Sequence, residues 1–128
     1  MRFESNHAVI VGEVSLVNAT PHSLTFSVGE DVVSIPPVEG LAKVISATPA
    51  EKVYMGNIPG CQIVSTTFLP SQEGVAYLQS VPSHTLIVGS IIAAQAFRYP
   101  VVALVTVPGF ERVPPEQKRM RADKFTAY

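Results

Sequence analysis

The chain has 128 residues, of which 47% are apolar and only 15% are charged, and its formal net charge is −1. This length is typical of one domain, which buries roughly two-thirds of the surface exposed by the unfolded chain. The single cysteine, Cys61, excludes an intramolecular disulfide and a cysteine-rich metal site. Because charged residues usually make up about 25% of a globular chain, we expect part of the apolar surface to be buried against other chains.

The first third of the sequence predicts short strands. Eleven prolines and eight glycines separate segments rich in β-branched and aromatic residues, a spacing typical of an all-β barrel or sandwich. We expect a first strand at residues 7–17 and a second at residues 23–28, where apolar and polar side chains alternate. Residues 29–31 predict a turn into a hairpin partner at residues 32–35, and residues 39–45 predict one or two helical turns.

The middle of the chain predicts a second group of strands, at residues 52–55, 62–69, 75–80 and 85–88. The apolar run at residues 91–97 predicts either another strand or a short buried helix capped by Ser90, and periodicity does not decide between them. Residues 101–107 form a β-branched run that predicts a buried central strand.

The C-terminal segment differs in composition from the rest. After two consecutive prolines, residues 116–124 have the composition of a short helix. Residues 112–128 carry five basic and two acidic side chains, whereas the rest of the chain carries four basic and eight acidic ones. We therefore expect a β domain over residues 1–113 with a short N-terminal arm. A basic helix or tail over residues 114–128 would pack on this domain or on a neighbour.

Neither a membrane anchor nor a secretion signal is expected. The longest apolar run, residues 86–107, is interrupted by Gly89, Arg98 and Pro100, so it lacks the about 20 uninterrupted apolar residues that span a bilayer. The N-terminal residues 1–7 contain no apolar core followed by a cleavage site. We expect an intracellular protein with no signal peptide and no transmembrane segment.

Residues suited to catalysis or to metal binding are few and scattered. His7, His22 and His84 lie far apart in the sequence and form no recognised metal-ligand spacing. Phosphate-binding glycine loops and the nucleophile motif of hydrolases do not occur in the sequence. We therefore predict no catalytic residue, no metal and no cofactor. A small enzyme whose site combines His22, His84 and Cys61 is the least favoured hypothesis.

Two segments resemble parts of oligonucleotide-binding barrels. Residues 6–14, with Gly12, resemble the first strand of single-strand-binding and primosomal proteins, in which a glycine lets the strand bend. Residues 84–92, with Val88-Gly89-Ser90, resemble the start of a later strand in these proteins. The resemblance implies weak, salt-sensitive binding of single-stranded nucleic acid. The contacts would come from the basic and aromatic C-terminal residues Arg112, Lys118, Arg119, Arg121, Lys124, Phe125 and Tyr128.

The hypothesis that composition favours is a non-enzymatic structural protein that forms a homo-oligomer. Low charge and strands that are apolar on both faces are typical of subunits with large apolar interfaces. A small virion component, such as a capsid decoration or cement protein or a head-to-tail joining protein, fits this size and composition. Its partners would be other copies of itself and another protein of the same assembly, bridged by residues 1–7 and 112–128. The predicted oligomer interface consists of Leu86, Ile87, Val88, Ile91, Ile92, Phe97, Val101, Val102 and Leu104.

Overall fold

The computed structural model describes residues 7–55, 58–114 and 117–128. The N-terminal arm expected at residues 1–7 lies outside the described residues, apart from His7. The strands are β1 (Val9–Val11), β2 (Val14–Asn18), β3 (Leu24–Val28), β4 (Asp31–Ile35), β5 (Ala47–Met55), β6 (Gln62–Pro70), β7 (Thr85–Val88), β8 (Val101–Thr106) and β9 (Met120–Thr126). The helices are α1 (Leu41–Val44), α2 (Gln72–Ser80) and α3 (Ile91–Phe97).

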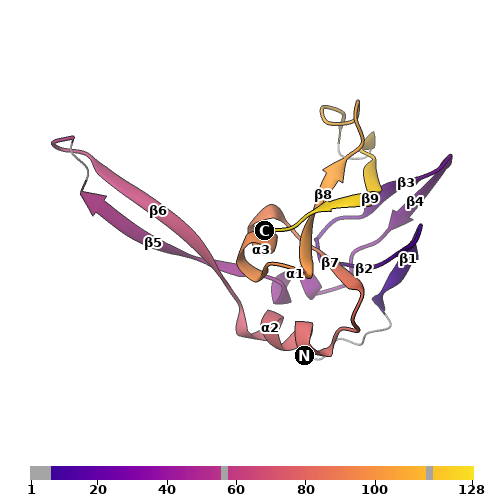
Figure 1. Ribbon diagram of the computed structural model, residues 1–128, viewed down its shortest axis with the longest axis horizontal. Coiled ribbons are helices and arrows are strands. Elements are labelled where there is room, and N and C mark those ends of the chain that lie inside the picture. The colour runs from indigo at the N-terminus through magenta and orange to yellow at the C-terminus, as the bar shows by residue number, and fades with distance from the viewer. Residues whose placement is uncertain (1–6, 56–57, 115–116) are drawn as a thin grey trace.

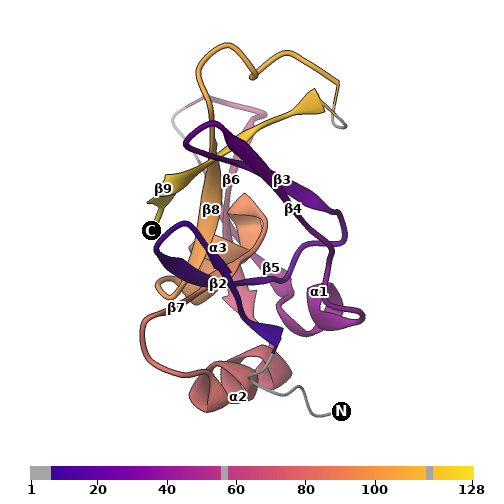
Figure 2. The ribbon, with the colours of Figure 1, turned by 90° about the vertical axis from the view of Figure 1, so that its right-hand side faces the viewer.

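Seven of the strands form one nearly closed, barrel-like sheet in the order β1-β2-β7-β8-β9-β3-β4 (Figures 1 and 2). The hairpins β1–β2 and β3–β4 are antiparallel, whereas β2–β7, β7–β8 and β3–β9 are parallel. The strands β5 and β6 form a separate two-stranded sheet. The prediction of a small, mainly β domain is therefore confirmed, and of the two architectures considered the barrel is the one observed.

Elements with regular alternation lie where the sequence places them. The hairpin expected at residues 23–35 is β3–β4, joined by a two-residue turn in which Gly29 has a φ of 60°. The helical turns expected at residues 39–45 are α1.

Within the described residues, none of the helices has the length and apolarity needed to cross a membrane.

The strands β7 and β8 are buried on both faces. Because successive side chains in a strand point to opposite faces, Val88 and Val102 lie inside the barrel, in the cluster that contains residues of β1, β3, β4 and β9. Ile87 and Val101 face outward, where they pack against apolar side chains of α1, α2 and α3. The apolar run at residues 86–107 therefore reflects burial on both sides within one chain.

Serine caps explain two helices, one where a strand was expected and one where a strand and a helix were both open. The strand expected at residues 75–80 is part of α2, so this prediction is wrong. The Ser71 hydroxyl accepts a hydrogen bond from the Gly74 backbone N–H at 3.0 Å and caps the helix. Residues 91–97 adopt the helical alternative, α3, with Ser90 as the N-cap.

The helix expected at residues 116–124 is also wrong over the part of that segment that the structure describes. From Met120 the chain forms β9, which lies in the middle of the sheet between β8 and β3. Its first two residues pair with β3, and Phe125 and Thr126 pair with β8. Because its backbone completes two strand ladders, the C-terminal segment is an integral strand of the barrel rather than a separate tail.

The two motifs that resemble oligonucleotide-binding barrels occupy other positions in this fold. The strand expected at residues 7–17 is divided into β1 and β2 by a two-residue turn, in which Gly12 has a φ of 62°. Gly12 is therefore a turn residue and not the bend of a long strand. Gly89 follows β7 and leads into α3 rather than into a strand. The order of the seven strands also differs from the five-stranded Greek-key barrel of that family.

Candidate functional site

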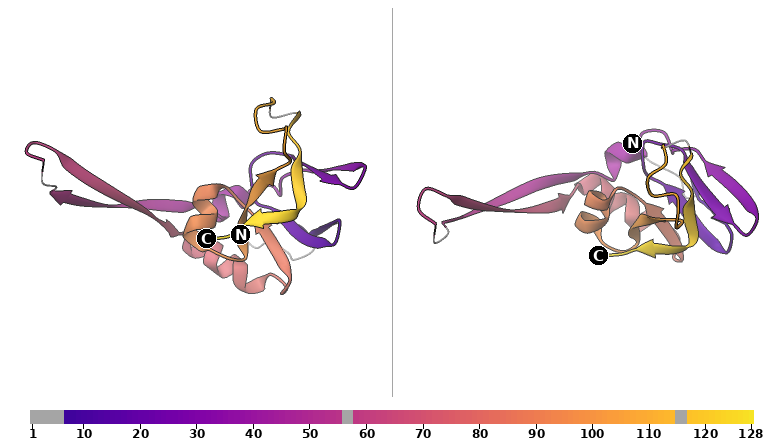
Figure 3. Two further views of the ribbon diagram at one scale, coloured as in Figure 1. Left: turned by 45° about the horizontal axis from the view of Figure 1, so that its top comes forward. Right: turned by 90° about the horizontal axis from the view of Figure 1, so that it is seen from above.

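The hairpin formed by β5 and β6 extends away from the barrel (Figures 1 and 3). Its strands pair over nine residues each, from Ala47 opposite Pro70 to Met55 opposite Gln62. At about 3.3 Å per residue, the paired region is about 30 Å long. We name this hairpin, residues 47–70, the arm. Its base packs against α3, and the rest projects from the body of the protein.

Apolar side chains are exposed on both faces of the arm. Val53 and Val64 lie opposite each other on one face, and Ile63 and Leu69 lie on the other. All four are between 47% and 54% exposed. Strand β6 carries no charged residue, so no charge protects it against association with another chain. Since a two-stranded hairpin is at best marginally stable alone in water, the arm has the properties of a segment that needs a partner.

The sequence contains two features that belong to the arm. Between Lys52 and Arg98 the only charged residue is Glu73, and residues 56–60, between the two expected strands, are rich in glycine and proline. Strands were expected at residues 52–55 and 62–69, and both lie in the hairpin, although β5 begins five residues earlier, at Ala47. Their exposure could not be foreseen, because apolar residues in strands are far more often core than surface.

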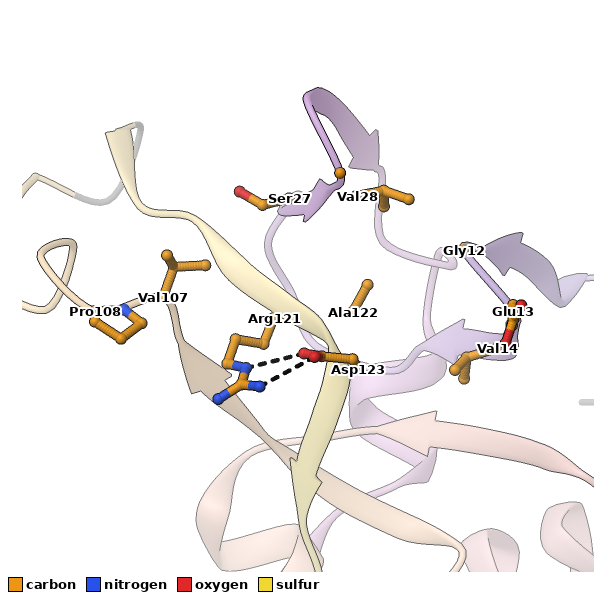
Figure 4. Close-up of a pocket in the computed structure, with 11 residues that line it drawn as sticks. Gly12, Glu13, Val14, Ser27, Val28, Val107, Pro108, Arg121, Ala122 and Asp123 are labelled. Carbon is orange, nitrogen blue, oxygen red and sulfur yellow. Dashed lines mark hydrogen bonds and ion pairs between the residues drawn. The ribbon is translucent and has the colours of Figure 1, made fainter.

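The turns of the β1–β2 and β3–β4 hairpins lie at the opposite end of the molecule from the arm (Figure 3). A groove lies between these two turns (Figure 4). Its volume is about 610 Å³. The β1–β2 turn at Glu13 and the β3–β4 turn at Gly29 form two walls, and Pro108 after β8 forms a third. Ala122 of β9 lies between these walls. Both turns have the sequence Gly-Glu, and of the two acidic residues Glu13 lines the groove.

An irregularity in β9 shapes the groove. Leu104 pairs with Phe125 and Thr106 pairs with Met120, so one residue of β8 faces four residues of β9. The extra residues form a bulge, which bends a strand and re-aims its side chains. Three of the bulge residues line the groove, namely Arg121, Ala122 and Asp123.

Arg121 and Asp123 form a bidentate ion pair in the groove (Figure 4). Arg121 Nε donates to Asp123 Oδ1 at 2.9 Å, and Arg121 Nη2 donates to Asp123 Oδ2 at 3.0 Å. These hydrogen bonds lower the pKa of the Asp123 carboxyl and raise the pKa of the guanidinium. Both groups are open to solvent, so the pair orients Arg121 more than it stabilises the fold. The guanidinium predicted to contact nucleic acid or a neighbour is thus already engaged within the chain.

The pH dependence of this ion pair can be measured directly. We expect the Asp123 carboxyl to titrate below about 3.9, the ordinary pKa of aspartate, and to move up toward that value in the Arg121→Gln variant. Because the folded-state pKa is lowered, the pair contributes to stability above the ordinary pKa, and this contribution is lost as the pH falls through the folded value. Carboxyl chemical shifts followed by NMR against pH report the titration.

Lys124→Gln is the matched control for that titration. Lys124 acts on the Asp123 carboxyl through its charge alone, as the smallest of the causes that lower its pKa. The control should therefore move the midpoint much less than Arg121→Gln does. Equal shifts in the two variants would show that the hydrogen-bonded geometry is wrong.

Other residues predicted to contact nucleic acid or a neighbour are also held by their own chain. The Arg119 guanidinium lies over the Phe110 ring, 5.9 Å from its centroid, and donates to two carbonyl oxygens of its own loop at 3.2 Å. The half-buried Phe125 ring packs against the barrel core, 6.5 Å from the centroid of Phe26, so part of its surface is already covered by its own chain. Of the remaining predicted contacts, Arg112, Lys124 and Tyr128 are exposed and Lys118 is half-buried.

Some residues of the apolar interface predicted from the sequence are fully buried in the fold, and the others keep exposed surface. Ile87, Val88, Val101 and Val102 are at most 2% exposed. They have no surface to offer to another copy, so their assignment to an oligomer interface is corrected. The reason is that β7 and β8 are covered on both faces by the same chain. The other predicted residues keep surface, since Ile91 and Ile92 are exposed on α3 and Leu86, Phe97 and Leu104 are half-buried.

The residues of the enzyme hypothesis are not brought together. Cys61 directly precedes β6 at the outer end of the arm, whereas His22 and His84 precede the barrel strands β3 and β7. Over residues 7–55, 58–114 and 117–128, no group of three or more histidine, cysteine or acidic side chains is placed to hold a metal ion. A site that combines these three residues is therefore inconsistent with the fold.

No protein-family model, curated protein sequence or solved structure matches this chain. The arm and the groove therefore carry the functional argument.

Proposed function

We propose that this protein is a structural subunit that assembles with copies of itself, and that the arm forms the main contact with the neighbouring copy. The observation that carries the proposal is the exposure of the arm. Apolar side chains cover both of its faces, and among the described residues only its base is packed against the rest of the chain. An unsupported hairpin of this kind gains order when a second chain covers it.

The energetic gain from covering the arm is appreciable. Val53, Ile63, Val64 and Leu69 are each about half exposed. Full burial of such side chains stabilises by roughly 1.5–3 kcal/mol each, so completing their burial contributes about 1 kcal/mol per residue, or about 4 kcal/mol in all. Association also costs translational and rotational freedom, so a stable oligomer requires that the surface receiving the arm adds contacts of its own.

The assembly that we propose is a virion, in which the protein acts as a capsid decoration or cement protein or as a head-to-tail joining protein. The proposal is supported by analogy with such virion proteins, which are short and β-rich. This chain is also short and β-rich, and its main exposed feature is the arm. An arm of about 30 Å is as long as a domain of this size is wide. It can therefore reach across a neighbouring copy, which is the geometry that a continuous shell or ring needs.

The double variant Ile63→Lys with Val64→Asp tests the proposal. It places one charge on each face of the arm and leaves the net charge unchanged, and both positions are exposed, so the barrel is unaffected. We expect the wild-type protein to have the native mass of an oligomer at low and at high salt. The variant should have the mass of a single chain, because charged side chains cannot be buried in an apolar contact without a partner. Light scattering on the purified proteins measures both.

Val75→Asp is the matched control, since Val75 is a comparably exposed apolar residue on α2, outside the arm. It should keep the wild-type native mass. A wild-type protein that is a single chain at both salt concentrations contradicts the proposal, as does an arm variant that still forms the oligomer. A mass that rises only when single-stranded DNA is added at low salt would favour the nucleic-acid alternative instead.

A further inference from the structure

We infer that the copies join head to tail, with the outer end of the arm of one copy seated in the groove of the next. The inference rests on the proposed function, and it adds the surface that receives the arm and the symmetry of the contact. It assigns a binding role to the groove between the β1–β2 and β3–β4 turns.

The arm and the groove lie at opposite ends of the molecule. The arm points in one direction, and the two hairpins that flank the groove point in the other (Figures 1 and 3). An arm can therefore enter the groove of another copy only when that copy has the same orientation along the long axis. Two different surfaces meet at each such contact, so the contact is heterologous, and successive contacts close into a ring or continue as a filament.

The outer end of the arm and the groove are also chemically compatible. Residues 58–61, at the outer end of the arm, carry no charge, and Ile58 among them is exposed. The groove presents Val14 and Val28 as apolar lining, beside the Glu13 carboxylate and the Arg121–Asp123 ion pair. Because the charges of Arg121 and Asp123 offset each other, the remaining charge is the Glu13 carboxylate, and such a groove favours an uncharged apolar insert over an acidic one.

A stable contact requires the arm to bury a larger area than one of its faces offers. One face of the arm, about 30 Å by about 10 Å, offers about 300 Å², well below the about 800 Å² per partner of a standard interface. Contact on both faces and at the outer end approaches that area, so the receiving surface has to enclose the arm. The hairpins on either side of the groove provide apolar surface for this purpose, because Ile10 of β1 and Val32 of β4 are 70% and 55% exposed.

Complementation between two defective variants tests the head-to-tail contact. The arm variant is Ile63→Lys with Val64→Asp, and the first groove variant is Ser27→Trp, which fills the groove. The second groove variant, Ile10→Asp with Val32→Asp, changes only exposed side chains and so does not depend on the core tolerating a larger residue. Circular dichroism and thermal unfolding establish that each variant is folded.

We expect each variant alone to have the mass of one chain. An equimolar mixture of the arm variant with either groove variant should have the mass of two chains, because such a pair contains one intact arm and one intact groove. A second groove variant that keeps the wild-type native mass would overturn the groove assignment and leave the proposed function standing. A mixture that remains at the mass of one chain would also overturn it. An arm variant that keeps the wild-type mass would overturn the proposed function itself.

Disulfide trapping provides an independent measurement, since Cys61 is the only cysteine and lies at the outer end of the arm. In the Ser27→Cys variant, two thiols from neighbouring copies would be oxidised to one disulfide by added diamide, which takes up the two hydrogens. We expect a ladder of covalent multimers on a non-reducing gel, and no ladder in the Gln79→Cys control on α2. Covalent dimers without larger multimers in both variants would indicate Cys61–Cys61 disulfides between two arms. This result would overturn the inference.

Discussion

Replacing Asn18 with aspartate is expected to lower the free energy of unfolding by about 4 kcal/mol at pH 7. Asn18 is 1% exposed, and its side-chain N–H groups donate to the carbonyl oxygens of His22 and Ile35 at 2.8 and 3.1 Å. Its side-chain oxygen accepts from the backbone N–H and the hydroxyl of Thr20 at 3.0 and 2.6 Å. Asn18→Asp keeps the shape but turns both donated hydrogen bonds into contacts between acceptors, with a buried charge.

The loss caused by Asn18→Asp should depend on pH in a defined direction. The surrounding carbonyl oxygens favour the neutral form of the introduced carboxyl, so its folded-state pKa lies above the ordinary value of about 3.9. The variant is therefore least destabilised below that value, where the carboxyl is protonated and can donate one hydrogen bond. Its stability then falls as the pH rises through the folded pKa. Chemical denaturation at several pH values between 3 and 7 measures the trend, relative to wild type.

Gln95→Glu provides the matched control, because it makes the same amide-to-acid change at an exposed position on α3. We expect it to alter the free energy of unfolding by at most about 0.5 kcal/mol, with no comparable trend in pH. If Asn18→Asp behaves like this control, the hydrogen bonds assigned to Asn18 do not hold the barrel together.

Asn18 connects the stability of the barrel to the groove. The strands β1 and β4 are the two edges of the sheet, and no ladder joins them. Asn18, at the end of β2, binds the carbonyl oxygen of Ile35 at the end of β4 through its side chain, and its own carbonyl oxygen accepts from Val38 N–H at 3.1 Å. These bonds fix the β3–β4 hairpin relative to β1–β2, and the groove lies between the turns of these two hairpins.

The parts of the fold that could be predicted from sequence are the strands with one face buried and the other face exposed to solvent. In β3 the side chains of Leu24 and Phe26 are buried and Thr25 between them is half-buried, and a period of two marks such a strand clearly. The hairpin turn at Gly29 is equally local, because a positive φ in a two-residue loop favours glycine.

The predictions that were wrong concern elements whose structure depends on contacts between residues distant in the sequence. Helix α2 has Gly74 near its start and no long apolar stripe, and its cap is Ser71, whose hydroxyl also donates to the Val44 carbonyl oxygen of α1 at 2.6 Å. Strand β9 has a helix-like composition, but pairing with β3 and β8 overrides its propensity. The same limit applies to the candidate site, because the groove joins residues 12–14, 27–29 and 121–123, which no motif connects.

Replacing Gly74 with alanine should destabilise the protein by about 2 kcal/mol, although the same change in an exposed helix stabilises by about 1 kcal/mol. A Cβ atom at this position would lie 2.7 Å from the Val44 backbone oxygen and 2.5 Å from Cε1 of the Phe97 ring. Gly74 is thus the point at which α1 and α3 approach the backbone of α2. The ring can rotate or shift, but the carbonyl oxygen belongs to the turn that ends α1 and cannot move without disturbing the apolar cluster between the helices and the outer face of the barrel. Thermal unfolding, followed by circular dichroism, measures the loss.

A second substitution separates the contribution of the Phe97 ring from that of the Val44 oxygen. In a Phe97→Leu background the ring is absent, so Gly74→Ala should cost less than in the wild type, while the contact with the Val44 oxygen remains. Val75→Ala, at the next and exposed position of α2, should change stability by less than about 1 kcal/mol. If Gly74→Ala stabilises the protein, as it would in a helix with nothing against it, then α2 does not sit against α1 and α3. In that case the surface from which the arm emerges is built differently, since α3 packs on both the core and the base of the arm.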